Sequence, residues 1–344
     1  MAAIWNVAGI AAPAYHAVSL FVHVLNAWLL LALLRVCDRL SGSPATALVA
    51  ATFFAVHEGH QEAVMWFSAI NELLLFFFGL AALVCWMRGR TFASAALFAL
   101  ALLSKESAVI LLPLFVLVSP PRQWKRLWPL ALLTGLAVAS IAVSHENSFR
   151  FNDGSFSLAA PVWITWPQSF ARLLWIWGCP SIAVIFMLAP REARRRAAMA
   201  LAWIGISLLP YSFLAYSTRI PSRQTYLASA GLAILFGLAA DHAIRAWPQH
   251  RRVLAGIFVL MLAHNAIYLW TKKRAQFVER AAPTDGLIAL ARRTSAPIYM
   301  QCFPLPDIVA KEAVRLAAGR SPDTLVWTSP APSGAVTYCY RESR

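Results

Sequence analysis

Long apolar runs, separated by short polar stretches, follow one another from residue 15 to residue 270. A helix needs about 20 apolar residues to cross the roughly 30 Å hydrocarbon layer of a membrane. The pattern predicts ten membrane helices, at residues 15–36, 45–57, 65–87, 91–103, 107–119, 127–143, 168–189, 197–217, 225–244 and 252–270. We therefore expect residues 1–271 to form an all-α polytopic membrane domain.

A polar segment with shorter periodic elements follows the last apolar run. The pattern predicts helices at 284–293 and 307–318 and strands at 297–303, 324–328 and 335–341. Residues 272–344 are thus expected to form a small α+β appendage. Cys302 and Cys339 fall on two of the strands and can pair in an oxidising compartment. The alternative is two unpaired thiols on separate strand faces.

Composition supports a membrane environment. Hydrophobic residues make up 60% of the chain and charged residues 13%, against about 25% charged residues in soluble domains. The net charge of +15 does not indicate nucleic-acid binding, because the basic residues form short clusters between apolar runs and no basic face is interleaved with aromatic residues. The expected partner is the lipid bilayer, with no nucleic acid.

The basic clusters predict the topology. They begin at Arg35, Arg88, Arg122, Arg191 and Arg245. Basic residues are enriched in cytoplasmic loops, and all five clusters lie on the cytoplasmic side if the odd-numbered helices run from the outside to the cytoplasm. This parity places residues 144–167 in an outer loop with an interfacial helix, and the C-terminal appendage outside. The Ala- and Arg-rich composition favours a bacterial cytoplasmic membrane.

The apolar region 91–119 contains Ser104, Lys105 and Glu106 at its centre. A single helix would be about 42 Å long and would bury these polar residues in the hydrocarbon layer. We therefore expect two short helices that meet at this break. The helix before the polar turn 57–62 is equally short, so both turns are expected below the outer membrane surface, around an outward-open polar chamber.

The turn 57–62 carries the first candidate residues, His57, Glu58, His60 and Glu62. The two histidines are three positions apart, which does not match the His-Glu-x-x-His metalloprotease motif. Facing a chamber, this set can hold a divalent metal, orient a phosphate or supply a general base. The alternative is an ordinary solvated turn between helices.

Two cations are the second kind of candidate. Lys105 is suited to attracting an anion, with Glu106 opening the next helix, or the two charges simply neutralise each other. Arg223 lies at the start of the ninth helix on the same side and is suited to a bidentate grip on phosphate. Its alternative role is that of an interfacial arginine.

Three further polar positions accompany them. Asn71 and Glu72 open the long apolar part of the third helix, where a carboxylate is costly, so we expect Glu72 to face the interior of the helix bundle. Tyr226 follows Arg223 in the same segment. We treat Asn71 and Tyr226 as accessory residues, together with Glu106.

The segments HEGHQEAV (57–64), LSKES (103–107) and RQTYLAS (223–229) resemble motifs of the membrane O-mannosyltransferase-like proteins. These belong to the C-type glycosyltransferase superfamily, which uses polyprenyl-phosphate sugars as donors. The resemblance covers roughly residues 5–245. Glu58 and Ala228 stand where that family has prolines.

The resemblance implies an inverting transferase in which an acidic residue deprotonates the hydroxyl of a protein or glycan acceptor. The family carries this acid in an outer loop after its first span. Here no Asp or Glu precedes Asp38, so we expect the chain to be N-terminally incomplete relative to that family. Glu62 or Glu58 is then the candidate catalytic acid within this sequence.

The resemblance also implies that basic residues stabilise the departing lipid phosphate. Lys105 and Arg223 are the candidates for this role. His57 and His60 are the candidate ligands of a divalent metal, Mg or Mn.

Two other functions remain open. A transporter or flippase of a lipid-linked or anionic solute needs the same chamber but no chemistry, and a catalytically incomplete relative would keep the fold alone. A transporter is expected to show related halves with matching broken helices, whereas the short helices occur only in the first half of this chain.

Overall fold

The computed structural model describes residues 6–9, 11–143, 156–215 and 220–340. Close contacts divide the chain into two compact units. The larger unit is Tyr15–Ala266, and the smaller one combines the described residues before Tyr15 with those from Ile267 on.

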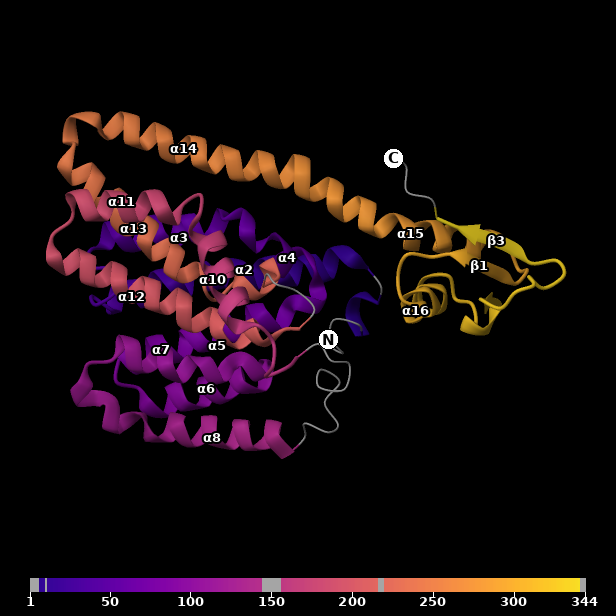
Figure 1. The fold of residues 1–344 in the computed structure, drawn as a ribbon, viewed down its shortest axis with the longest axis horizontal. Helices are drawn as coiled ribbons and strands as arrows, with labels where there is room; N and C mark the ends of the chain where they lie inside the picture. Colours follow the sequence, from indigo (N-terminus) through magenta and orange to yellow (C-terminus); the bar gives the residue numbers. More distant parts are fainter. Residues whose placement is uncertain (1–5, 10, 144–155, 216–219, 341–344) are drawn as a thin grey trace. The chain divides into compact units, whose positions relative to one another are not determined.

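Nearly all of the larger unit is helical (Figure 1). Its α-helices are α2 (Ala12–Val36), α3 (Pro44–Val56), α4 (Gln61–Met65), α5 (Ile70–Met87), α6 (Thr91–Ser104), α7 (Leu111–Val118), α8 (Trp128–Val143), α10 (Val162–Leu174), α11 (Gly178–Leu188), α12 (Arg191–Leu208), α13 (Ser229–Ala246) and α14 (Arg251–Tyr268). Short 3-10 turns join them: η1 (Glu58–His60), η2 (Phe67–Ala69), η3 (Glu106–Ile110), η4 (Pro121–Leu127), η6 (Leu209–Phe213), η7 (Ser222–Thr225) and η8 (Pro248–His250).

Five of the described helical segments are long and apolar enough to cross a membrane. They are Ala12–Val36, Phe67–Met87, Pro121–Val143, Arg191–Phe213 and Pro248–Arg293. The pair α10 and α11, bent by 70°, makes a sixth if it is taken as one span. The described helices are therefore those of an α-helical membrane protein, with five or six candidate spans by length and composition, and the expected number of ten stays a prediction.

The remaining expected spans are mostly shorter helices. Pro44–Val56, Thr91–Ser104 and Glu106–Val118 are apolar but have 10–17 residues each. The predicted break between the last two is confirmed: Lys105 adopts an extended conformation, with φ −163° and ψ 141°, between α6 and η3. A charged residue at this point thus ends one helix instead of lying in the middle of a long one.

Several helices differ from the predicted boundaries. The third, predicted at 65–87, starts at Ile70, and the eighth, predicted at 197–217, runs from Arg191 to Leu208. The seventh predicted helix, 168–189, starts earlier, at Val162, and is broken between α10 and α11. The ninth starts at Ser229 instead of 225, because η7 forms a separate turn before it. Residues 144–155 of the predicted outer loop lie outside the described residues.

Helix α13 packs closely against α3 and α12, and two glycines make the approach possible. A Cβ atom on Gly231 would lie 2.6 Å from the Ala200 carbonyl oxygen, and one on Gly237 would lie 2.6 Å from the Thr46 carbonyl oxygen. At the other end of α13, the Asp241 carboxylate accepts hydrogen bonds from the Ser43 hydroxyl at 2.7 Å and from the Thr46 hydroxyl at 3.1 Å. Gly237 in the middle of α13 and Asp241 near its end therefore both hold this helix against the start of α3.

The smaller unit is the α+β appendage. It contains α15 (Arg274–Arg293), β1 (Ile298–Cys302), α16 (Asp307–Ala317), the 3-10 turn η10 (Pro322–Thr324), β2 (Leu325–Val326) and β3 (Val336–Cys339). The strands form a parallel sheet in the order β2-β1-β3. Leu287, Met300 and Val314 are buried in its core. The predicted succession of helices and strands is thus confirmed.

Cys302 and Cys339 form a disulfide between β1 and β3. The sequence left open whether these two cysteines pair or remain free thiols, and the structure shows that they pair. The helix predicted at 284–293 is longer than expected. It belongs to a continuous helical segment, Pro248–Arg293, which runs through a π-helical turn at Leu269–Lys273.

Candidate functional site

A cavity of about 550 Å³ lies in the larger unit, among α5, η3, η6 and η7. Its polar lining includes Asn71, Glu72, Lys105, Glu106 and Arg223. Apolar and aromatic side chains complete it, among them Trp66, Ile110, Ile141, Leu209 and Phe213. Both candidate cations and two of the three accessory residues therefore line one cavity.

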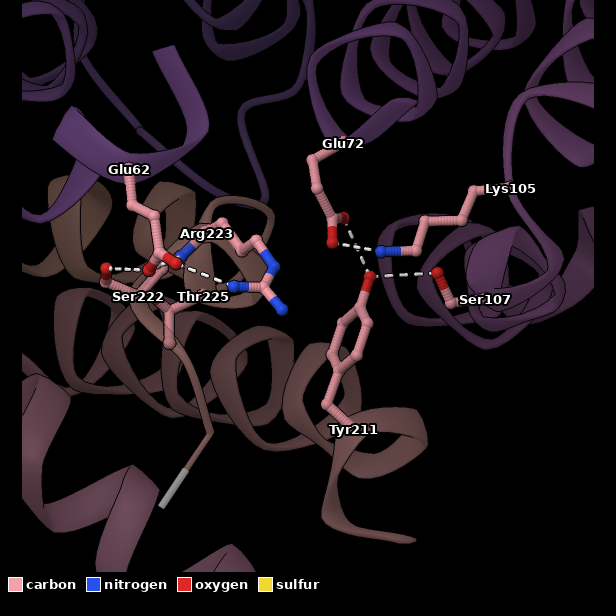
Figure 2. A network of polar contacts seen from close by, with 8 residues as sticks. All are labelled: Glu62, Glu72, Lys105, Ser107, Tyr211, Ser222, Arg223 and Thr225. Atoms are coloured by element: carbon pink, nitrogen blue, oxygen red, sulfur yellow. Dashed lines mark hydrogen bonds and ion pairs between the residues drawn. The ribbon is translucent and has the colours of Figure 1, made fainter. Parts of the chain in front are cut away.

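Lys105 is held by a buried carboxylate. It is only 6% exposed, and its ammonium group pairs with Glu72 on α5. The Tyr211 hydroxyl donates a hydrogen bond to the second Glu72 oxygen at 2.9 Å and lies 2.8 Å from the Ser107 hydroxyl (Figure 2). A charged carboxylate deep in an apolar helix is tolerable because these partners compensate for its lost hydration.

Arg223 is held by a second carboxylate. Its terminal nitrogen Nη1 lies 2.6 Å from Glu62 Oε1, and its backbone N–H donates to Glu62 Oε2 at 3.2 Å. The Ser222 hydroxyl donates to the same Oε2 at 2.5 Å. The guanidinium carbon lies 4.7 Å from the centre of the Trp66 ring. These contacts fix both the position and the plane of the guanidinium.

The contacts of Glu62 also determine its charge. Burial acts to raise the pKa of this carboxyl, but the hydrogen bonds from Ser222 and Arg223 and the charge of Arg223 outweigh burial and lower the pKa below its usual value. Glu62 is therefore a stable anion whose two oxygens are both engaged with the η7 turn. Such contacts favour a role in positioning Arg223.

The two charged groups belong to one site. In Figure 2 the Arg223 guanidinium lies between Glu62 and the group formed by Glu72, Lys105 and Tyr211. Each cation is anchored by its own carboxylate, from α4 in one case and α5 in the other. Cations that are fixed before a ligand arrives lose little entropy on binding, so the arrangement is suited to an anion with an apolar attachment.

His57 and His60 do not line the cavity. His60 Nε2 lies 2.6 Å from the Ser229 hydroxyl, and its ring packs against Phe54. His57 stacks on Phe53 at 5.1 Å between ring centres. The described lining of the cavity contains no residue of the turn 57–62, Glu62 included, although the chamber was expected to be formed by this turn as well as the Lys105 turn. The two histidines pack in an aromatic cluster instead.

Glu58 and Tyr226 also lie away from the cavity lining. A Glu58 oxygen lies 3.3 Å from Nδ1 of His57. The Tyr226 hydroxyl is buried and lies 2.7 Å from Nδ1 of His23, and it accepts a hydrogen bond from Asn26 at 3.2 Å. Tyr226 therefore ties the start of α13 to α2.

No group of three or more His, Cys, Asp or Glu side chains is placed to hold a metal ion in the part of the chain that the structure describes. The divalent metal stays a prediction.

The sequence did not single out Tyr211, Ser107 or Trp66 as parts of the site. A tyrosine or tryptophan at the end of an apolar run is normally an anchor at the membrane interface. The presence of these residue types in the sequence therefore does not indicate a polar network. Glu72 was expected to face the bundle interior, and its side chain is indeed 4% exposed.

Comparison of the chain with protein-family models, with curated proteins and with solved structures gives no match.

Proposed function

We propose that this protein is a membrane glycosyltransferase that moves a sugar from a polyprenyl-phosphate donor to an acceptor on the extracytoplasmic side of a bacterial cytoplasmic membrane. The observation that carries the proposal is the common cavity of Lys105 and Arg223. Its two anchored cations and its apolar wall fit a phosphate joined to a lipid chain. The resemblance of the motifs around Glu62, Lys105 and Arg223 to O-mannosyltransferase-like proteins supports the same chemistry.

In the proposed reaction an acceptor oxygen attacks the anomeric carbon of the sugar. The bond from that carbon to the phosphate oxygen breaks, and its electron pair stays on the lipid phosphate. Lys105 and Arg223 stabilise the charge that develops on this leaving group. Glu62 and Glu72 keep the two cations in place, so no reorganisation is needed when the bond breaks.

The membrane topology is part of the proposal. Helices α3, α6 and α7 with η3 are each about 20 Å long at 1.5 Å per residue, less than the hydrocarbon thickness. Counting these three helices and α13 as spans, in addition to the five long helices and the bent pair α10–α11, gives ten. In that arrangement the short helices end below the outer membrane surface, and so does the cavity beside them. The disulfide of Cys302 and Cys339 favours an extracytoplasmic appendage, because such bonds persist in oxidising compartments.

Labelling of single cysteines tests this topology. Ser68→Cys, in the cavity lining, should react with a membrane-impermeant maleimide in intact cells beyond the level of the parent chain. Arg88→Cys, at the far end of α5, should react only after the membrane is opened. The reverse pattern would remove the proposed orientation.

A binding assay tests the proposed function. The protein in lipid nanodiscs should bind undecaprenyl phosphate, and Arg223→Gln should weaken that binding at least tenfold. Arg88→Gln is the matched control, since Arg88 is an exposed arginine outside the cavity. Transfer of tritiated mannose or glucose from undecaprenyl phosphate should fall about 10²–10³-fold in Arg223→Gln, in line with the loss of one charge-stabilising donor.

The same assay separates the alternatives. A transporter or flippase would bind undecaprenyl phosphate and move it between leaflets without releasing sugar, and a catalytically incomplete relative would bind it and do neither. If the wild-type protein does not bind undecaprenyl phosphate, the proposed function is wrong.

A further inference from the structure

Gln224 lines the cavity and has a buried polar atom without a partner. Its side chain is only 9% exposed, yet its oxygen Oε1 accepts no hydrogen bond in the part of the chain that the structure describes. Among the described residues that line the cavity, no other has a buried side-chain oxygen or nitrogen in this state. An unpaired buried acceptor is costly, because it has given up its hydrogen bonds to water without replacing them. A group that enters the cavity and donates to this oxygen would remove the cost.

An unpaired oxygen does not by itself mark a binding site. Gln61 on α4 also has a buried Oε1 without a partner among the described residues, and Gln61 does not belong to the described lining of the cavity. Gln224 differs because it lines the cavity directly beside Arg223, one of the two anchored cations. Its carboxamide is therefore placed where a ligand of the cavity would meet it.

The backbone around Gln224 is held in place by the η7 turn. The Gln224 N–H donates a hydrogen bond to the Pro221 carbonyl oxygen at 3.0 Å, and the Thr225 hydroxyl donates to the Ser222 carbonyl oxygen at 2.7 Å. The N–H of the preceding residue, Arg223, donates to Glu62 at 3.2 Å. The turn thus presents a guanidinium and a carboxamide to the same cavity from a fixed backbone, which is how polar groups of a binding site set the orientation of a ligand.

A carboxamide carries both an acceptor oxygen and N–H donors, so its best partner is a group that donates and accepts. In a polyprenyl-phosphate sugar, the phosphodiester oxygens only accept hydrogen bonds and the lipid chain forms none. The sugar hydroxyls both donate and accept. The sugar is bonded directly to the phosphate, so a phosphate held by Arg223 brings the sugar next to Gln224.

We propose that Gln224 binds a hydroxyl of the transferred sugar and that this sugar is uncharged, an inference that rests on the proposed function. The Gln224 oxygen accepts a hydrogen bond from a sugar hydroxyl, and its N–H donates to a sugar oxygen. Gln224 is thus a specificity-determining residue that contacts the sugar, whereas Lys105 and Arg223 contact the phosphate.

The test measures the Kd of three lipids for the full-length protein in nanodiscs: undecaprenyl phosphate, undecaprenyl-phosphate mannose and undecaprenyl-phosphate glucose. Gln224→Met and Gln224→Leu both replace the carboxamide by an apolar side chain. The matched control is Gln61→Met, which removes a glutamine with the same kind of unpaired oxygen outside the described lining of the cavity. Gel filtration monitors folding, and binding of undecaprenyl phosphate, which has no sugar, reports an intact phosphate site.

Both Gln224 variants are expected to raise the Kd of at least one sugar lipid about tenfold, as the loss of one or two neutral hydrogen bonds implies. The Kd of undecaprenyl phosphate should stay within about twofold of the wild type, and Gln61→Met should leave all three Kd values within the same range.

Four results would overturn the inference while the proposed function stands. They are an equally large increase in Kd for undecaprenyl phosphate, a change below about threefold for both sugar lipids, the same loss in Gln61→Met, and a wild-type protein that binds undecaprenyl phosphate but neither sugar lipid. A wild-type protein that binds none of the three lipids overturns both the inference and the proposed function.

Discussion

Replacing Glu72 by alanine tests the energetics of the site most directly. The Glu72 and Lys105 side chains are each 4% exposed, so the substitution leaves a buried ammonium group without its carboxylate. Removing one partner of a buried ion pair typically costs about 3–5 kcal/mol, because the remaining charge has lost its hydration and its counter-ion. Tyr211 also loses the hydrogen bond that its hydroxyl donates to Glu72. We therefore expect the free energy of unfolding to fall by about 3–5 kcal/mol.

The measurement is unfolding of the purified full-length protein in detergent micelles, followed by circular dichroism as a denaturing detergent is added. The matched control is Glu192→Ala, since Glu192 is 60% exposed and lies 3.7 Å from Arg196. An exposed pair of this kind contributes about 0–1 kcal/mol. The two glutamates thus separate the effect of burial from the loss of a negative charge.

A double variant, Glu72→Met with Lys105→Met, checks the cause. Apolar side chains of similar volume can replace a buried ion pair with little loss of stability, so this variant should unfold within about 1 kcal/mol of the wild type. Equal destabilisation in the single and double variants would mean that lost packing, and not an uncompensated charge, is responsible. A Glu72→Ala protein as stable as the wild type would contradict the reasoning altogether.

Three other outcomes follow from the structure. Gly231→Ala places a Cβ atom 2.6 Å from a carbonyl oxygen of α12 and should lower the free energy of unfolding by about 1–3 kcal/mol, whereas Gly256→Ala, with no atom within 4 Å, should be neutral or stabilising in the same assay. Cys302→Ser opens the disulfide with Cys339, 37 positions away, and should cost the appendage about 3–4 kcal/mol, measured as faster proteolysis of residues 272–344 in the full chain. Burial raises the pKa of the Tyr338 hydroxyl, and the nearby Tyr340 adds to this effect, so the folded appendage keeps the proton to higher pH than the unfolded chain does. The stability of the appendage should therefore be complete below about pH 10 and decline above it. Tyr338→Phe should reduce this decline, measured as proteolysis of residues 272–344 over a pH series.

The arrangement of helices along the chain follows from hydrophobic periodicity and the cost of burying charge. The break at Lys105 is an example, because no single helix could carry three polar residues through the hydrocarbon layer without a large penalty. The succession of helices and strands in the appendage was predictable, since short apolar runs alternate with an amphipathic helix there, whereas the order β2-β1-β3 and the parallel pairing were not part of the prediction.

The meeting of distant residues could not be predicted in the same way. Glu62 and Arg223 were both recognised as candidates, yet their ion pair joins positions 161 apart and depends on how α13 packs. Tyr211 reaches Glu72 over 139 positions for a similar reason. Sequence patterns report the local surroundings of a residue, whereas these contacts arise from the packing of several helices.

The histidines show the opposite error. His57 and His60 stand in a polar turn, which favours exposure, but the rings pack against Phe53 and Phe54 from the preceding helix. Imidazole can stack on aromatic rings as well as bind water or metal. The residue type alone therefore does not decide between these surroundings.

The place of α13 between α3 and α12 has a consequence for biosynthesis. Helix α3 is complete by Val56, but its partner α13 does not exist until the ribosome has reached Ala246. Until then, the face of α3 that receives Gly237 has no neighbour, and Arg223 cannot settle against Glu62 because the turn that carries it is part of the same late addition. The packing of α3 against α13 and the Glu62–Arg223 ion pair should consequently form together, late in synthesis, and a nascent chain released before this point would have neither.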